Sequence, residues 1–564
     1  MGGLHRRSCS RNRTAQTPRL ALRVGLLTLI ATAMLGLVSG CGKEESDNGT
    51  SAATTPVRGG TLTVAYQGEP ATLDPALDWD DGWNILYSVA SGLLKYSSGS
   101  GEAGTKLEGD LAVEVPEPTD GGTVYTFRLR DGLRFSPPNG RQITAADLKW
   151  SFERMMSLPT APGTYLYSSI KGADEFVNGT ARHVSGYQVV DNQTVRIVLR
   201  SPDPTILYTL AMPFACVVPK EAVESAGKQF GQRPVSAGPF LVKSWVRGQR
   251  ITLERNPNYW DADNVYLDGV VVELGVSPST AVLRVQRGDL DITGDTLPSA
   301  DLARLQSDPE WQRYVGAESF LNITYLYMNV HMEPFDDVRV RRAVASAIDR
   351  EKLAKLFMGG ATTLDNIYPE GLSAAGLSPA FPANDPEAAR RLLSESGDDA
   401  PRITIHARNT EPFPRLLQSI QYDLKQVGID ARVQLHPEST YWTLMGKPHE
   451  MEIGLCDWYM DFPDPSNIIK PLLSKASAKG GGFNASFWWN PKVERLVQEA
   501  DTMSDDAARD RIYGKIAAIV HDEVPIVPLV QVLRTSLHDK DVGGFYVTPR
   551  GTLYLADYWK TNGK

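Results

Sequence analysis

A strand–helix–strand pattern at residues 403–435 constrains the fold of this chain more than any other feature. Residues 403–407 and 431–435 alternate between apolar and polar side chains, as strands do, and residues 415–427 between them have the spacing of a helix. Earlier in the chain, similar strand and helix units alternate with hairpins. This mixture indicates an α/β architecture with insertions.

Several local signals place further elements. Residues 60–66 and 123–129 alternate between apolar and polar side chains, as half-buried strands do. Thr144 has the position of a helix N-cap, with Asp147 three residues later to satisfy the first turn. Residues 385–397 begin with an acidic N-cap followed by proline and end at glycine. We therefore expect two strands and two well-capped helices at these places.

Residues 1–40 have the pattern of an export signal. Six arginines precede an apolar run at residues 24–38, which is too short to span a bilayer comfortably. The sequence from Val38 to Cys41 resembles a bacterial lipobox, which is cleaved before the cysteine so that Cys41 carries lipid. Residues 41–58 have no apolar period and are expected to form a flexible tether.

This pattern predicts an exported protein, lipid-anchored on the outer face of the bacterial cell membrane. A soluble signal peptide with an incidental Cys41 is the alternative.

The length and net charge of the chain limit the number of lobes and the kinds of binding partner it can have. Removing residues 1–40 from the 564 leaves 524, enough for two or three lobes. The net charge of −9 then falls to about −15, because the removed segment holds six arginines and no acid. This balance argues against nucleic acid and against attraction to anionic lipid. Cys216 and Cys456 can form a disulfide in an exported chain or remain buried free thiols.

The segment at residues 457–465 combines acids, large aromatics and two prolines directly after an apolar run at residues 451–456. The prolines exclude a regular helix, so the acids are expected to leave a strand end and enter a fixed loop. Carboxylates beside indole rings suit a pocket for a cationic, partly apolar small molecule. An acidic surface loop with one core tryptophan is the alternative interpretation.

A series of short sequence motifs extends over most of the chain after residue 58. They occur at residues 73–75, 127–132, 144–147, 238–240, 255–260, 340–343, 385–389, 457–465 and 522–525. In this order they resemble the family 5 extracellular solute-binding proteins, the peptide, dipeptide and nickel receptors of ABC importers. The resemblance implies capture of a short di- or oligopeptide for a membrane permease, no enzymatic activity, no cofactor and a monomer.

The resemblance also implies a type II periplasmic-binding-protein fold, in which two lobes close on a ligand around a hinge. The hinge crossings are expected near Leu321 and Val524, and the final strand after Val524 is expected to rejoin the first lobe. The implied divisions are lobe I at 59–96, 231–318 and 524–564, an inserted subdomain at 97–230, and lobe II at 319–523.

For the binding site, the resemblance implies that Asp461, three residues after Trp458, pairs with the α-amino group of a peptide. Arg408 is expected near the peptide carboxylate, with Asp457 in the same wall. Leu455 departs from some oligopeptide receptors, which carry arginine there, and this favours short peptides or another ligand. Tyr66, Glu69 and Trp83 are candidates for the opposing lobe; core or rim placement is the alternative for these three, and a loop-capping role for Asp461.

Other functions fit the residues less well. The chain lacks the motifs of serine hydrolases, zinc proteases and phosphate-binding loops, and its cysteines and histidines lack metal-ligand spacing. Two of the three acids Asp457, Asp461 and Asp464 could act as a glycosidase pair only at a suitable separation of their carboxyl groups. A surface adhesin or signalling receptor could use the same fold.

Within the family, the ligand remains open. Nickel is disfavoured because histidine is sparse near residues 457–465. An oligosaccharide is an alternative, since several tryptophans could stack on sugar rings. These are Trp442, Trp458, Trp488 and Trp489.

Overall fold

A computed structural model describes residues 55–79, 82–397, 400–479, 481–503 and 505–562. The predicted signal, the predicted lipidation at Cys41 and most of the tether lie outside these residues. Residues 54–564 form one compact unit. Within the described ranges, no helix combines the length and apolarity that a membrane crossing requires.

The first sheet is five-stranded in the order β10-β1-β9-β8-β7. Its strands are β1 (Thr61–Tyr66), β7 (Phe240–Val246), β8 (Arg250–Arg255), β9 (Gly269–Leu274) and β10 (Ile292–Thr293). β1 runs parallel to both of its neighbours, whereas β7 and β8 form a hairpin. The strand predicted from alternation at residues 60–66 is confirmed as β1.

The second sheet is seven-stranded and contains the predicted strand–helix–strand unit. Its strands are β11 (Val315–Ser319), β12 (Asn322–Met328), β13 (Ala361–Thr363), β14 (Arg402–Arg408), β15 (Asp430–His436), β16 (Ile453–Tyr459) and β17 (Ile526–Leu537). β14 and β15 are parallel and are joined by helix α11 (Phe413–Gln426), which confirms that prediction. β16 is also parallel to β14. The ends of β14 and β16 therefore bring Arg408 and Asp457 to the same region.

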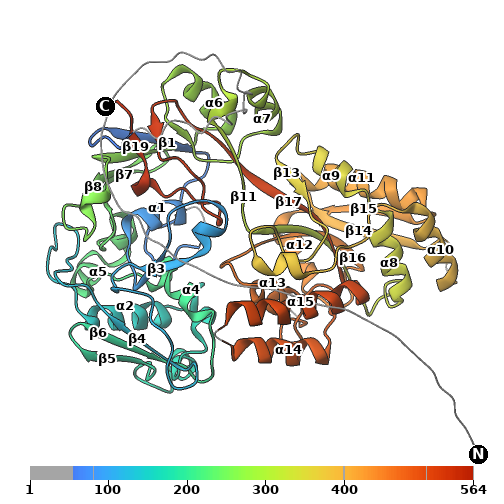
Figure 1. The fold of residues 1–564 in the computed structure, drawn as a ribbon, viewed down its shortest axis with the longest axis horizontal. Helices are drawn as coiled ribbons and strands as arrows, with labels where there is room; N and C mark the ends of the chain where they lie inside the picture. Colours follow the sequence, from blue (N-terminus) through green and yellow to red (C-terminus); the bar gives the residue numbers. More distant parts are fainter. Residues whose placement is uncertain (1–54, 80–81, 398–399, 480, 504, 563–564) are drawn as a thin grey trace, which may run out of the picture. The chain divides into compact units, whose positions relative to one another are not determined.

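The path of β17 differs from the prediction. We expected the chain to rejoin the first lobe after Val524, yet Ile526 pairs with Tyr327 and Val530 with Thr324 in β12. The apolar side chains from Val524 to Val530 are buried in the core of the second sheet, which explains this pairing. The second half of β17 then runs beside β11 (Figure 1). The chain thus leaves the second sheet along β17, and the other lobe boundaries stay predictions.

Residues 97–230 contain a three-stranded antiparallel sheet of β4 (Val124–Arg128), β6 (Thr194–Val198) and β5 (Tyr187–Asp191). Helix α2 (Ala145–Ser157) packs with this sheet. Its N-terminus has the predicted capping box between Thr144 and Asp147. The buried side chains of this part share one core with those of the first sheet.

The remaining elements surround these three sheets. The short strands are β2 (Leu94–Tyr96), β3 (Leu107–Gly109), β18 (Val542–Gly543) and β19 (Trp559–Lys560). The helices of the first half are α1 (Trp83–Val89), α3 (Ala173–Val177), α4 (Ile206–Leu210), α5 (Lys220–Ala226), α6 (Pro278–Arg287) and α7 (Ser299–Gln306). Those of the second half are α8 (Val338–Ala347), α9 (Arg350–Lys355), α10 (Pro386–Ser396), α12 (Glu438–Met445), α13 (Ser466–Leu473), α14 (Pro491–Asp501) and α15 (Asp506–Glu523).

The helix predicted after residue 385 is confirmed as α10: Asp385 accepts a hydrogen bond from Ala388 N, and Gly397 ends the helix in a left-handed conformation. Cys216 and Cys456 are both free thiols, so the described structure has no bond between them.

Candidate functional site

A cavity of about 820 Å³ lies at the end of β16. Six of the seven predicted ligand-binding residues line it: Tyr66, Trp83, Arg408, Asp457, Trp458 and Asp461. Three acids and three arginines line the cavity together, namely Asp295, Asp457, Asp461, Arg408, Arg534 and Arg550. Its wall therefore carries as many acids as arginines. Beside them lie aromatic rings that belong to the core of the first sheet and to the core of the second sheet.

Asp461 is held by Asn467 in the first turn of α13. The Asn467 amide donates to Asp461 Oδ2 over 3.1 Å, and Asn467 Oδ1 accepts from the Asp461 N–H over 2.9 Å. The same oxygen accepts from the Trp458 indole over 3.2 Å. Burial raises the pKa of Asp461, and the Asn467 amide and the Arg550 guanidinium oppose this rise. Asn467 therefore fixes the carboxylate in place without neutralising its charge.

Arg408 and Asp457 form an ion pair across the neighbouring strands β14 and β16. Arg408 Nη1 also lies 3.3 Å from a carboxylate oxygen of Glu438. The guanidinium packs over the rings of Phe413 and Trp442, 4.2 and 5.2 Å from their centroids. Burial raises the pKa of Asp457, and Arg408 opposes the rise. Arg408 thus lines the cavity, but two carboxylates already accompany its charge.

The lining of the cavity also includes Tyr66 of β1, Trp83 of α1 and Arg550, which sequence reasoning missed. Arg550 Cζ lies 4.7 Å from the ring centroid of Trp83, and 5.6 and 5.7 Å from those of Tyr87 and Tyr96. Residues 549–551 have no alternation or motif that marks them, and the aromatic partners of Arg550 are more than 400 positions away in sequence. Only the folded chain brings them together.

Glu69 does not line this cavity. Its carboxylate accepts hydrogen bonds from the Trp245 indole over 2.9 Å and from Gly248 N over 3.1 Å, and it lies 3.4 Å from Arg247. These donors belong to the β7–β8 hairpin. Glu69 therefore closes a turn of the first sheet instead of facing the cavity, and its predicted binding role lacks this support.

The tryptophans considered for sugar stacking divide into two pairs. Trp442 and Trp458 line the cavity. Trp488 is buried in the core and donates its indole N–H to Glu523, and Trp489 is 39% exposed and packs against Lys475. Among the residues that the structure describes, no group of three or more histidines, cysteines and acids is arranged to hold a metal ion.

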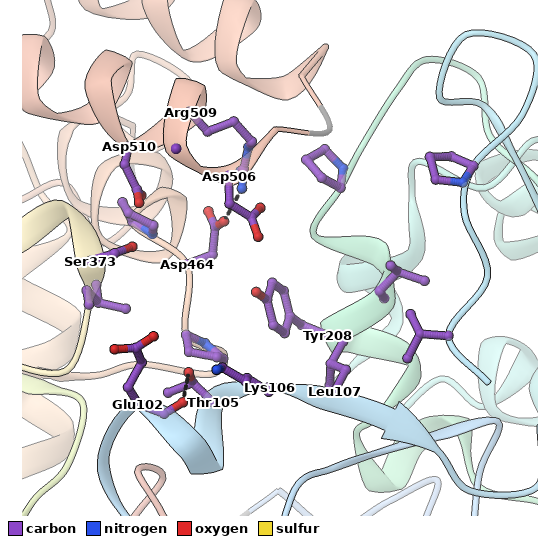
Figure 2. Close-up of a pocket in the computed structure, with 18 of the residues that line it drawn as sticks. Glu102, Thr105, Lys106, Leu107, Tyr208, Ser373, Asp464, Asp506, Arg509 and Asp510 are labelled. Carbon is purple, nitrogen blue, oxygen red and sulfur yellow. Dashed lines mark hydrogen bonds and ion pairs between the residues drawn. The ribbon is translucent and has the colours of Figure 1, made fainter. Parts of the chain in front are cut away.

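A second cavity, of about 580 Å³, is lined by residues 463–465 among others, and Asp464 belongs to its wall (Figure 2). Figure 2 shows Arg509 of α15 reaching to Asp464, and the two groups are 2.6 Å apart. Their side chains are only 5% and 3% exposed. Burial would raise the pKa of Asp464, but Arg509 outweighs it and the pKa lies below its ordinary value. The charge of Asp464 is therefore paired with that of Arg509 within the protein.

Comparisons with known proteins agree with this architecture. The family of bacterial extracellular solute-binding proteins, family 5 Middle, matches residues 106–480. The di/tripeptide-binding protein 2 of Pseudomonas aeruginosa (strain UCBPP-PA14) is 28% identical over 87% of this chain and 93% of its own. Heme-binding protein A of Haemophilus influenzae (strain ATCC 51907 / DSM 11121 / KW20 / Rd) is 28% identical over 93% of this chain and 97% of its own.

A solved structure, the clavulanic acid biosynthesis oligopeptide binding protein 2, superposes with a TM-score of 0.82 at 26% identity. It covers 90% of this chain and 96% of its own. The predicted α/β fold of the periplasmic-binding type is thereby confirmed. Since the family match spans more than half of the sequence, the chain belongs to the bacterial extracellular solute-binding proteins of family 5.

Proposed function

We propose that this protein binds a short peptide in the cavity at the end of β16 and delivers it to the permease of an ABC importer. The observation that carries the proposal is the half-buried carboxylate of Asp461, which Asn467 orients in a cavity of about 820 Å³ and which has no ion pair among the described residues. A carboxylate of this kind suits the α-amino group of a peptide, because both charges gain from a charge-assisted hydrogen bond away from bulk water.

The rest of the wall supports a ligand that carries both charges. Two arginines, Arg534 and Arg550, line the cavity in addition to the paired Arg408. Aromatic side chains provide apolar surface between these charges, as in most small-molecule sites. The names of two compared proteins, a di/tripeptide-binding and an oligopeptide-binding protein, point to the same ligand class.

The setting of this activity is part of the proposal. Lipid at Cys41 holds the protein on the outer face of the bacterial cell membrane, and residues 42–58 give the folded part reach toward the permease. The protein acts as a monomer. Binding, without turnover, is its role: it presents an intact peptide to its partner.

Capture of peptides from a defined mixture tests the proposal. The full chain, purified in detergent, is incubated with an equimolar library of di- to pentapeptides, and retained molecules are identified by native mass spectrometry. We expect unmodified short peptides to be retained. Retention of an oligosaccharide from a parallel glycan library, or a heme absorbance band after incubation with heme and no retained peptide, would contradict the peptide assignment.

A further inference from the structure

We propose that Arg550 is the second anchor of the cavity and binds a carboxylate of the peptide whose ammonium group pairs with Asp461. This inference rests on the proposed function and names the group that holds the other charge of the ligand. It replaces the expectation that Arg408 does so.

The backbone around Arg550 is fixed. Gly551 N donates to Thr548 O over 2.8 Å, and Thr552 N donates to the Thr548 hydroxyl over 3.2 Å. Pro549 O accepts from Leu321 N over 2.8 Å, which ties this turn to the start of β12. Gly551 has a φ of 75°, a conformation that glycine adopts without strain. The stem of Arg550 therefore starts from a defined position.

The guanidinium lies in an aromatic surround formed by Trp83, Tyr87 and Tyr96. Ring faces attract a cation but accept few hydrogen bonds in its plane. Arg550 Nε and Nη1 are accordingly buried without any hydrogen-bond partner. Burial lowers the pKa of Arg550, but Tyr87, Tyr96, which also forms a hydrogen bond with the guanidinium, and Asp461 outweigh it, so the pKa lies above its ordinary value and the group stays charged. A half-buried cation with N–H groups that lack a hydrogen-bond partner calls for an anion.

The other two arginines of the cavity are already occupied. Arg408 pairs with Asp457 and Glu438. Arg534 donates to the Thr296 hydroxyl over 2.8 Å and to the Gly294 carbonyl. Each of them retains a single unpartnered Nε, whereas Arg550 retains two unpartnered nitrogens and has no carboxylate in an ion pair. Among the described residues that line the cavity, Arg550 is thus the cation best prepared for a ligand anion.

Asp461 and Arg550 come from different parts of the chain and face the same cavity. Each affects the pKa of the other, so they are close enough to interact. A zwitterion would satisfy both, with its ammonium on Asp461 and its carboxylate on Arg550. That carboxylate is either the C-terminus of the peptide or an acidic side chain.

Calorimetry with matched peptides tests the inference. The best peptide from the capture experiment is synthesised as the free acid, as the C-terminal amide, and with any acidic side chain replaced by its amide. For the wild-type protein, we expect one of the two neutral forms to bind about ten- to a hundredfold more weakly. Which form is weakened identifies the source of the carboxylate. Equal affinities of all forms for the wild-type protein would overturn the inference without touching the peptide assignment.

Variants then locate the anchor. Arg550→Gln is expected to bind the free acid about ten- to a hundredfold more weakly and to lose the discrimination between acid and amide. Arg408→Gln is expected to keep that discrimination. If Arg550→Gln still discriminates and Arg408→Gln does not, the carboxylate lies at Arg408 and the inference is wrong.

Two further variants separate binding from folding. Arg130→Gln removes an arginine that stacks on Trp260 at 3.8 Å but does not line this cavity, and it should leave affinity unchanged. Arg550→Lys keeps the charge in the aromatic surround and should retain part of the discrimination even if Arg550→Gln unfolds. A melting temperature of Arg550→Lys well below that of the wild type, together with no acid–amide discrimination in the wild type, would assign Arg550 a structural role only.

Discussion

Asp461 and Asp464 are three residues apart in one segment, yet the fold gives them opposite situations. Asp464 is fully enclosed and meets Arg509, so its charge is neutralised within the protein and its pKa is lowered. Asp461 meets only the neutral amide of Asn467 in direct contact, and burial raises its pKa. The difference shows that an acid paired with a cation in the core is a structural group, whereas an acid held in direct contact by a neutral amide alone keeps its charge for a ligand.

The largest expected effect is on stability, from Asp464→Asn. The substitution leaves the buried guanidinium of Arg509 without its counter-ion, which should lower the free energy of unfolding by about 3–5 kcal/mol. Denaturant unfolding measures this. Asp506→Asn, at an exposed acid of the same cavity, is the control and should change stability by less than about 0.5 kcal/mol. If the two variants lowered the free energy of unfolding equally, the buried ion pair of Asp464 would contribute no more to stability than a surface acid does.

Asp461→Asn should have the opposite profile. It removes the partner of the peptide ammonium while Asn467 can still donate to the new amide oxygen, so peptide affinity should fall about ten- to a hundredfold. The free energy of unfolding should change little. Calorimetry and denaturant unfolding on the same preparation give both values. A strong loss of stability with unchanged peptide affinity would show that Asp461 is a structural acid and does not bind the peptide.

The two acids should also separate in their pH dependence. Because the folded pKa of Asp464 is below its unfolded value of about 3.9, its contribution to stability is present above that pH and is lost as pH falls through the lower folded pKa. The pKa of Asp461 is raised, so the carboxylate is protonated, and peptide affinity falls, at a higher pH than this. Calorimetry from pH 7 downward should show affinity declining while the protein remains folded. Affinity that stays constant until unfolding begins would contradict the raised pKa.

A smaller loss is expected from Asn467→Ala. The substitution removes the hydrogen bonds that orient Asp461 and Trp458 but leaves the carboxylate itself. Affinity should fall about fivefold, equivalent to about 1 kcal/mol. If calorimetry gave a loss as large as that of Asp461→Asn, Asn467 would have to contact the peptide directly.

The smallest effect is expected from Glu69→Gln. Glu69 contacts the β7–β8 hairpin and does not line the cavity. Peptide affinity should therefore be unchanged, and the free energy of unfolding should fall by about 1 kcal/mol or less. A loss of affinity comparable to that of Asn467→Ala, measured by the same calorimetry, would restore the predicted role of Glu69 in binding.

The sequence predicted those features that depend on neighbouring residues. The capping box at Thr144 and the proline and glycine limits of α10 are local. The strand before Asp461 was also predicted, but β16 continues through Asp457 to Tyr459, so Asp457 lies in the strand and only Asp461 follows its end. The strand–helix–strand unit at residues 403–435 also follows from spacing over a short stretch. The resemblance to a family then supplied the general fold.

Features that depend on distant partners escaped sequence reasoning. Residues 526–530 read equally well as a strand of either lobe, and only burial against β12 decides between the two sheets. Nothing near Glu69 indicates that the Trp245 indole is its partner, and nothing near Arg550 indicates Trp83. Likewise, the pairing of Arg408 with Asp457 depends on the order of β14 and β16 in the sheet.

The central claim is that Asp461 pairs with the ammonium group of a bound peptide. Calorimetry of one captured peptide, with its α-amino group free and then acetylated, tests this most directly against the wild-type protein and Asp461→Asn. We expect acetylation to weaken binding to the wild type about ten- to a hundredfold and to change binding to Asp461→Asn little. Equal weakening of both proteins by acetylation would place the ammonium elsewhere and contradict the account.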